Sequence, residues 1–189
     1  MMLKKSLILI FCTLFILQYS KVMANEEAKY EIIDKNEVYE IRKYSDRLAV
    51  ETSRAGIDSN FRKLFNYISG RNETQEKIAM TTPVTQVEKK GNMTMQFYLP
   101  SKFNSENVPN PIREDVKIIK IEGGYYGVLR YSGRASDNNF LKHKQILEKE
   151  LKKNNISIIS LPIRATYDSP FTLPMNRRNE AMFKVEINK

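Results

Sequence analysis

Cysteine is nearly absent from this sequence, because the only one, Cys12, lies within the first 24 residues. Without that segment the chain has no disulfide, no thiolate metal ligand and no thiol nucleophile, which excludes a disulfide-rich extracellular module. Histidine is equally scarce, since His143 stands alone, and this excludes a zinc site with two or three histidines. Nothing near His143 supports a Ser-His-Asp arrangement, and Gly123-Gly124 is typical of a strand turn rather than of a phosphate-binding loop.

The first 24 residues have the pattern of a secretory signal peptide. Lys4 and Lys5 precede an almost wholly apolar stretch over residues 6–19, and residues 22–24 offer a cleavage site after Ala24. The apolar stretch is short for a membrane span, and a retained N-terminal anchor is the alternative. We therefore expect an exported protein, periplasmic or secreted, whose mature part, residues 25–189, forms one domain.

The charge of the chain is positive but diffuse. The first 24 residues hold three lysines and no acid, so their removal lowers the formal net charge from +9 to +6. The basic residues are spread out, which argues against a nucleic-acid partner. A mild positive excess suits an anionic small ligand or an anionic membrane surface, and much of it serves solubility alone. We expect a monomer and leave peripheral membrane contact open.

Two helices are predicted. The first lies between Ser59, a candidate N-cap, and Gly70, a candidate C-terminal glycine, and the second covers residues 137–153 with Ser136 or Asp137 as its N-cap. Helical spacing predicts one apolar face on the first helix, made of Phe61, Leu64, Phe65 and Ile68. On the second helix the same spacing predicts a face of Phe140, Leu147 and Leu151.

Strand patterns fill most of the remaining chain and occur in a repeated order. Strands are predicted over residues 30–33, 38–44, 48–52, 84–88, 93–99, 116–121, 125–131, 156–167 and 180–187. Each half of the chain runs strand, helix, then an X-Pro segment and a closing strand, which indicates two copies of a β-α-β-β unit. We expect an α+β fold in which both copies form one closed or nearly closed, distorted antiparallel β-barrel, with the two helices outside.

Five segments then carry a resemblance to a known family. They are residues 39–44 (YEIRKY), 77–84 (KIAMTTPV), 97–100 (FYLP), 167–170 (YDSP) and 176–180 (NRRNE). In this order they resemble the motifs of the SOUL/heme-binding protein family over residues 30–187. The resemblance implies a distorted barrel with two flanking helices that binds heme or other tetrapyrroles. The same fold also resembles bacterial effector-binding domains, which hold drug-like ligands.

The resemblance also bears on how such a ligand is held. Some family members carry a histidine within the first motif, proposed as a heme ligand, whereas this chain has Lys43 there. A protonated lysine is a poor ligand for iron. Other members bind without that histidine, through an apolar groove beside the first helix with basic residues near the propionates, and we expect this second mode here.

The family resemblance implies that residues from the flank of the first helix and from adjoining loops line this groove. Methionine adapts to irregular flat ligands, and arginine can clamp a propionate through two hydrogen bonds. The candidate binding residues are Arg62, Asn66, Met80, Phe171, Met175, Arg177 and Arg178. For Arg177, Arg178 and Glu180 the alternative is a structural ion-pair turn. His143 is a candidate axial iron ligand, and the alternative is a residue at the helix boundary with its polar edge in water.

Three functions therefore stand side by side at this point. The first is a periplasmic or secreted protein that binds heme or another tetrapyrrole without chemistry on it. The second is an enzyme that modifies tetrapyrroles or another small ligand, for which no catalytic constellation is visible. The third is an effector-binding or protein-interaction module without heme. Composition and spacing alone indicate only a secreted α+β barrel. The family resemblance favours the first of the three functions.

Overall fold

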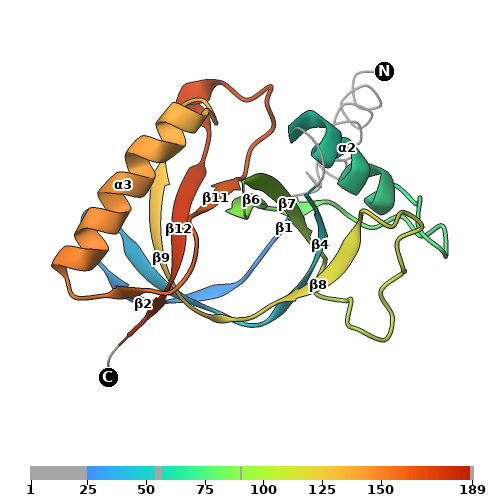
Figure 1. Ribbon diagram of the computed structural model, residues 1–189, viewed down its shortest axis with the longest axis horizontal. Coiled ribbons are helices and arrows are strands. Elements are labelled where there is room, and N and C mark those ends of the chain that lie inside the picture. The colour runs from blue at the N-terminus through green and yellow to red at the C-terminus, as the bar shows by residue number, and fades with distance from the viewer. Residues whose placement is uncertain (1–24, 54–56, 90, 188–189) are drawn as a thin grey trace, which may run out of the picture.

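Two α-helices pack on a curled, largely antiparallel sheet (Figure 1). The computed structural model describes residues 25–53, 57–89 and 91–187. The predicted signal peptide lies outside these residues. In chain order the elements are β1 (Glu26–Glu27), β2 (Tyr30–Lys35), β3 (Glu40–Tyr44), β4 (Arg47–Thr52), α2 (Ile57–Ile68), β5 (Thr81–Thr82), β6 (Val84–Lys89), β7 (Asn92–Tyr98), β8 (Lys117–Ile121), β9 (Gly124–Tyr131), α3 (Asp137–Lys153), β10 (Ser157–Ile158), β11 (Ile163–Thr166), the 3₁₀ turn η1 (Pro174–Asn176) and β12 (Asn179–Glu186).

The predicted repeat is confirmed by the order of the strands in the sheet. The first unit is β4-α2-β6-β7, with its strands in the spatial order β4-β7-β6, and the second is β9-α3-β11-β12, in the order β9-β12-β11. The two units join through the antiparallel pair β6 and β11. Each unit gains an outer neighbour, since β8 pairs with β4 and β3 pairs with β9. The two halves therefore share one sheet rather than forming separate domains.

The sheet curls into an open half-barrel instead of the closed barrel that was one of the expected forms. Its path runs from β2 to β8, and these two strands stand at opposite edges of it. A separate parallel pair, β1 with β5, brings the N-terminal segment against the chain that follows α2. The curl is thus bridged in part by the N-terminal segment rather than by closure of the strand ladder.

Strand alternation divides the core between the two faces of the sheet. In β12, Ala181, Phe183 and Val185 belong to the apolar cluster beneath α3, whereas Met182 belongs to a cluster on the opposite face. The cluster beneath α2 is the third, and it includes Val50, Phe97 and Leu99. Because side chains alternate with a period of two, each strand serves both a helix and the face opposite the helices.

α3 agrees with its prediction at both ends. It runs from Asp137 to Lys153, and the Ser136 side chain accepts a hydrogen bond from the Asn139 backbone N–H as its N-cap. Its buried residues are the three predicted ones, Phe140, Leu147 and Leu151. A regular 3.6-residue apolar pattern with a good cap was enough to define this element.

α2 corrects its prediction in two respects. It begins at Ile57, before the proposed cap Ser59. Its buried residues are Asn60, Leu64, Tyr67 and Ile68. Phe61 and Phe65 were expected in the core, but they are 40% and 48% exposed and stack on each other. The helix is turned toward Tyr67, because the Tyr67 hydroxyl finds a buried partner in the Pro109 carbonyl at 2.7 Å.

Candidate functional site

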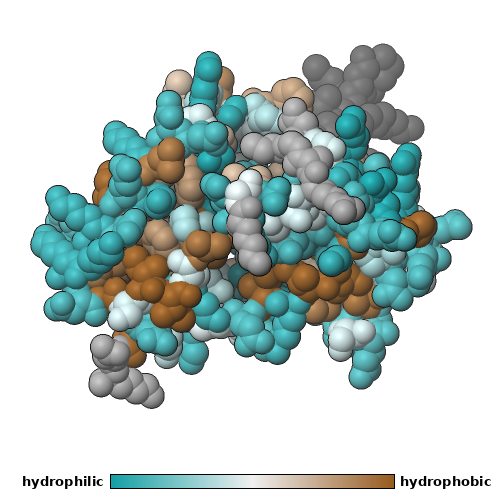
Figure 2. Space-filling view, in the orientation of Figure 1, coloured by the Kyte–Doolittle hydropathy of each residue, from teal (hydrophilic) through white to brown (hydrophobic). Residues whose placement is uncertain are grey.

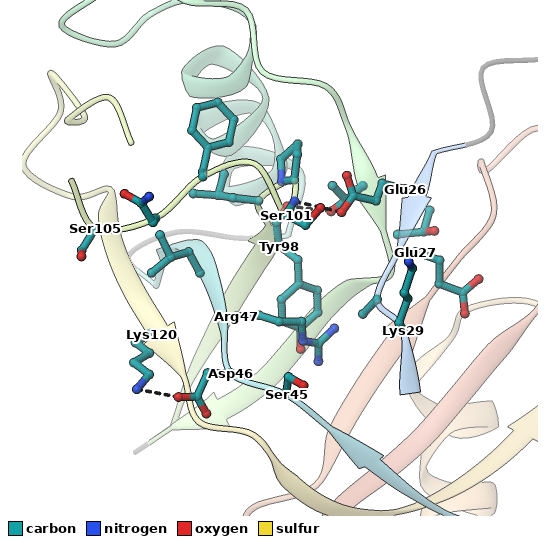
Figure 3. Close-up of a pocket in the computed structure, with 18 residues that line it drawn as sticks. Glu26, Glu27, Lys29, Ser45, Asp46, Arg47, Tyr98, Ser101, Ser105 and Lys120 are labelled. Carbon is teal, nitrogen blue, oxygen red and sulfur yellow. Dashed lines mark hydrogen bonds and ion pairs between the residues drawn. The ribbon is translucent and has the colours of Figure 1, made fainter. Parts of the chain in front are cut away.

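A large cavity, of about 860 Å³, lies where the β3–β4 turn, the N-terminal segment and the loop after β7 meet (Figure 3). Its walls come from residues 26–29, 45–48, 81–82, 98–101 and 103–105 and from Lys120 of β8. These segments are far apart in the sequence and meet because β4 pairs with both β7 and β8, and β1 pairs with β5. The volume falls within the range typical of small-molecule sites.

One wall of the cavity is apolar and firmly supported. Leu48, Leu99 and Phe103 line the cavity and also belong to the apolar cluster beneath α2. Ala28, Tyr98 and Pro100 add further apolar or aromatic surface. In the space-filling view, apolar side chains on the visible face gather over both halves of the sheet (Figure 2). A ligand with a broad apolar face would therefore meet a rigid surface backed by the core.

The acids of the cavity are already engaged. The Glu27 carboxylate pairs with Arg178 at 2.9 Å, and the Glu26 carboxylate accepts the Ser101 backbone N–H. Asp46 pairs with Lys120 at 2.6 Å, and hydrogen bonds from Lys120 and from the Gly123 backbone hold the pKa of this carboxyl below its usual range.

Two cationic side chains of the cavity, Lys29 and Arg47, have no carboxylate partner among the described residues. Across the part of the chain that the structure describes, no ion pair involves Lys29 or Arg47. Lys29 is exposed and comes from the N-terminal segment, whereas Arg47 begins β4. Glu27 and Asp46 are neutralised by cations, and the Glu26 carboxylate accepts the Ser101 backbone N–H. The cavity therefore also presents the positive groups of Lys29 and Arg47 to a ligand.

Behind the cavity lies a buried ionic network centred on Glu180, which is fully buried. Its carboxylate accepts hydrogen bonds from Arg42 at 3.1 Å, from the Tyr167 hydroxyl at 2.7 Å and from Arg178 at 3.0 Å. Arg178 also pairs with Glu27, so the network reaches the cavity wall. Burial and the Glu180 charge raise the pKa of Tyr167 far above its usual range, which keeps its hydroxyl a donor.

This network explains what three of the five motifs do in this chain. Residues 39–44 supply Arg42, residues 167–170 supply Tyr167, and residues 176–180 supply Arg178 and Glu180. The arginines neutralise the buried carboxylate, and every donor is directed at it. These motifs therefore build the framework of the site, whereas the motif 97–100 forms part of the cavity wall through Tyr98, Leu99 and Pro100.

Three of the sequence-predicted binding residues lie on or near α2 and outside the large cavity. Arg62 is exposed on the helix. Asn66 lines a second cavity of about 410 Å³ beside the C-terminal end of α2. Met80 is partly buried and packs against the apolar cluster beneath α2. The groove expected beside the first helix thus corresponds to a smaller cavity, to which only Asn66 of the seven predicted residues contributes.

The other four predicted residues lie in the loop before β12. Phe171 and Met175 are 95% and 73% exposed. Arg177 donates to the main-chain carbonyls of Thr172 and Pro170, which braces the loop. Arg178 belongs to the network around Glu180 and makes the ion pairs that were the alternative in the sequence analysis, whereas the contacts of Arg177 are hydrogen bonds to the main chain. The structure does not bring the seven residues together in one site.

His143, the candidate axial ligand, lies away from the large cavity, and so does Lys43, which stands where some family members carry a histidine. The Nδ1 atom of His143 is 2.7 Å from the Asn139 carbonyl, and its ring stacks on Tyr131 at 4.1 Å. Lys43 is exposed on β3, with its ammonium 6.0 Å from the Tyr125 ring. Neither residue lines the 860 Å³ or the 410 Å³ cavity. In the described residues no cluster of three or more His, Cys, Asp or Glu could hold a metal ion.

The cavity residues that the sequence analysis missed include Lys29, Arg47, Phe103 and Lys120. Lys29 and Phe103 lie outside the helices and strands, and Arg47 is the first residue of β4, so no periodic pattern marks these three, while Lys120 lies in the predicted strand 116–121 without a signal for binding. The one sequence signal for this cavity was the motif 97–100, whose tyrosine and proline lie in the wall.

Among the residues that the structure describes, no helix is long and apolar enough to cross a bilayer.

The fold defines an α+β protein with two β-α-β-β units on a common curled sheet, and solved structures share it. A crystal structure described as a hydrolase from Listeria innocua superposes with a TM-score of 0.56 at 11% identity, covering 82% of this chain and 94% of that one. The EcmrR C-terminal domain gives a TM-score of 0.58 at 13% identity, covering 83% and 98%. At these identities the likeness concerns the fold alone.

Sequence comparison identifies the family. The family model of the SOUL heme-binding protein matches residues 25–184, so this chain belongs to the SOUL family. Heme-binding protein 2 of Mus musculus is 30% identical and that of Homo sapiens is 31% identical, each over 75% of this chain and 75% of the relative. The family predicted from the five motifs is thereby confirmed.

Proposed function

We propose that this protein binds heme or a related tetrapyrrole, and that the ligand lies in the large cavity beside the N-terminal segment. Membership of the SOUL family and the names of the mammalian relatives support the ligand class. The observation that carries the choice of site is a cavity of about 860 Å³ with an apolar wall on the core beneath α2 and two unpaired cations, Lys29 and Arg47.

The chemistry of the cavity fits such a ligand in both of its parts. A tetrapyrrole has a wide, flat, apolar ring, for which Leu48, Leu99 and Phe103 offer a complementary surface. Guanidinium and ammonium groups stabilise the carboxylates of such a ligand once these are removed from water, and Arg47 and Lys29 supply one of each. The proposed site thus differs from the groove expected beside the first helix, although its apolar wall is shared with the cluster that α2 covers.

Binding in this cavity does not depend on a protein ligand to iron. Its described lining residues include no histidine, methionine or cysteine, and the ring of its tyrosine, Tyr98, packs against the Arg47 guanidinium. Burial of the ring and pairing of its carboxylates then supply the affinity. We therefore expect hemin and metal-free protoporphyrin IX to bind with similar affinity.

Side-by-side titrations with hemin and protoporphyrin IX test the proposal. Saturable absorbance changes with one ligand per chain are expected for both. Ser105 is an exposed residue of the cavity rim, so Ser105→Trp should obstruct the cavity and lower both affinities. Ser132 is exposed and outside the cavity, so Ser132→Trp is the matched control and should bind normally.

Three other outcomes would redirect the function. Spectra no different from those of hemin with an unrelated basic protein would remove tetrapyrrole binding. Equal binding of varied apolar dyes, without preference for porphyrins, would favour an effector-binding module. Conversion of heme to a product in the presence of a reductant would favour an enzyme. Full binding by Ser105→Trp, with an intact fold, would move the site away from this cavity.

A further inference from the structure

Arg47 is held in an unusual environment at the entrance to β4. Its guanidinium carbon lies 4.8 Å from the centre of the Tyr44 ring and 4.0 Å from the centre of the Tyr98 ring. Its Nε atom is buried and has no hydrogen-bond partner. The residue lines the large cavity, and Figure 3 shows its guanidinium beside Tyr98. The two rings therefore hold a positive group in place without neutralising its charge.

Three other arginines with large buried portions are neutralised by carboxylates, and the partly buried Arg177 donates to the main-chain carbonyls of Thr172 and Pro170. Arg42 pairs with Glu40 and Glu180, Arg164 pairs with Asp137, and Arg178 pairs with Glu27 and Glu180. Arg47 has no such pair among the described residues, although it is partly buried. Desolvation of a guanidinium with an unpaired N–H destabilises the fold, and stacking on aromatic rings offsets only part of that loss.

An arginine kept in this state is prepared for an anion. Its position is set by two rings, so little side-chain freedom is lost when a ligand binds. The missing partner would be planar and negatively charged, as a carboxylate is, and it would arrive from the cavity. The acids on the cavity wall do not fill this role. Glu27 pairs with Arg178 and Asp46 with Lys120. Glu26 accepts the Ser101 backbone N–H, and in the described residues it makes no ion pair with Arg47.

We propose that Arg47 is the carboxylate anchor of the large cavity and selects ligands that carry an acid group on a flat aromatic ring system. The inference deepens the proposed function, since it names the residue that recognises the acid of a tetrapyrrole. It stands on separate observations, namely the two aromatic rings and the unpartnered guanidinium. A neutral ligand of the same shape would gain nothing from Arg47.

The first test compares protoporphyrin IX with its dimethyl ester, which has the same ring and no charge. Arg47→Met should weaken binding of the acid by about 10- to 100-fold and leave the ester unchanged. Arg47→Lys keeps the charge without the planar fork and should give an intermediate loss. Arg130 is exposed on β9 and outside the cavity, so Arg130→Met is the matched control and should bind both normally.

A second ligand pair makes the inference independent of tetrapyrroles. 8-Anilinonaphthalene-1-sulfonate and N-phenyl-1-naphthylamine share an aromatic framework, and only the first is an anion. Arg47→Met should lower the affinity for the anion alone. If the wild-type chain binds neither porphyrin yet discriminates between the naphthalenes through Arg47, the tetrapyrrole function fails and the anchor stands. If it binds none of the four probes, both fail.

The unfolding stability of Arg47→Met distinguishes a ligand-binding role of Arg47 from a structural one. Because Arg47 lacks a carboxylate partner, Arg47→Met should unfold at a denaturant concentration no lower than the wild type. Ligand-induced thermal stabilisation by protoporphyrin IX should be present in the wild type and reduced in Arg47→Met. A marked loss of stability in Arg47→Met, with equal weakening of acid and ester, would overturn the proposal, and so would unchanged affinity for every ligand that the wild type binds.

Discussion

Glu180 illustrates how a single residue can be indispensable without touching a ligand. It is fully buried, and its carboxylate receives hydrogen bonds from Arg42, Tyr167 and Arg178. Removal of one member of a buried charged cluster leaves the others uncompensated in a region of low dielectric. The motif residues around Glu180 are therefore explained by the fold they hold together, while Arg47, outside every motif quoted above, carries the proposed recognition.

The Glu180→Gln variant tests this role at the residue scale. It keeps the size of the side chain, removes the charge and should lower the free energy of unfolding by about 3–5 kcal/mol, as measured by urea denaturation. Glu148→Gln removes an acid whose pairing with Lys152 is at the surface, and it should cost about 1 kcal/mol or less. Equal, small effects of the two substitutions would contradict a central role for the network.

At the scale of elements, the close approach of α3 to the sheet depends on a glycine. A Cβ atom at Gly127 in β9 would lie 2.9 Å from both methyl groups of Leu151, a fully buried residue of α3. Such a distance requires the helix or the leucine to move. Gly127 thus sets how closely the helix packs, which the apolar periodicity of α3 could not reveal.

Gly127→Ala should lower the free energy of unfolding by about 1–3 kcal/mol through overpacking. Leu151→Val shortens the opposing side chain, so Gly127→Ala should cost less in the Leu151→Val background than in the wild type. Denaturation of the two single variants and the double variant measures this coupling. Strict additivity of the two effects would mean that the alanine methyl does not press on Leu151.

At the scale of the whole molecule, buried tyrosines tie stability to alkaline pH in every part of the core. Burial raises the pKa to about 12 for Tyr131 beneath α3, for Tyr67 beneath α2, and for Tyr44 and Tyr126 on the opposite face. The ordinary tyrosine pKa of 10.0 applies once the chain unfolds. Between these two values the unfolded chain has lost phenolic protons that the folded chain still holds.

Stability should therefore fall as pH rises from about 10 to about 12, because the unfolded state binds fewer protons over that window. Below about 10 the phenols are protonated in both states, so their contribution is fully present there. The urea midpoint as a function of pH and the near-ultraviolet absorbance of phenolate measure these effects. Titration of these tyrosines near 10 in a chain that is still folded would contradict their burial.

Local sequence patterns and short motifs were sufficient to predict most of the fold. The boundaries of α3, the repeat of β-α-β-β units and the family followed from spacing, caps and short motifs, because those signals act between residues close in sequence. The rotation of α2 could not be predicted this way. Tyr67 is buried because a distant carbonyl, that of Pro109, accepts its hydroxyl.

The proposed site was largely beyond prediction from sequence. Arg62 and Asn66 were chosen for their place beside a helix, yet the large cavity uses turns and strand ends brought together by the pairing of β4 with β7 and β8. Arg178 was predicted to contact the ligand, but in the structure its guanidinium pairs with the buried carboxylate of Glu180. Export of the chain stays a prediction, because residues 1–24 lie outside the described structure.

By itself, the sequence determined which segments become helices and strands, that they repeat, and which family the chain joins. Only the tertiary structure decided which polar side chains find partners. Arg42 and Arg178 meet the carboxylate of Glu180, whereas Arg47 meets two aromatic rings and no acid. The reason is physical: periodicity depends on neighbours along the chain, but the charge that a cavity offers depends on which groups cancel one another in space.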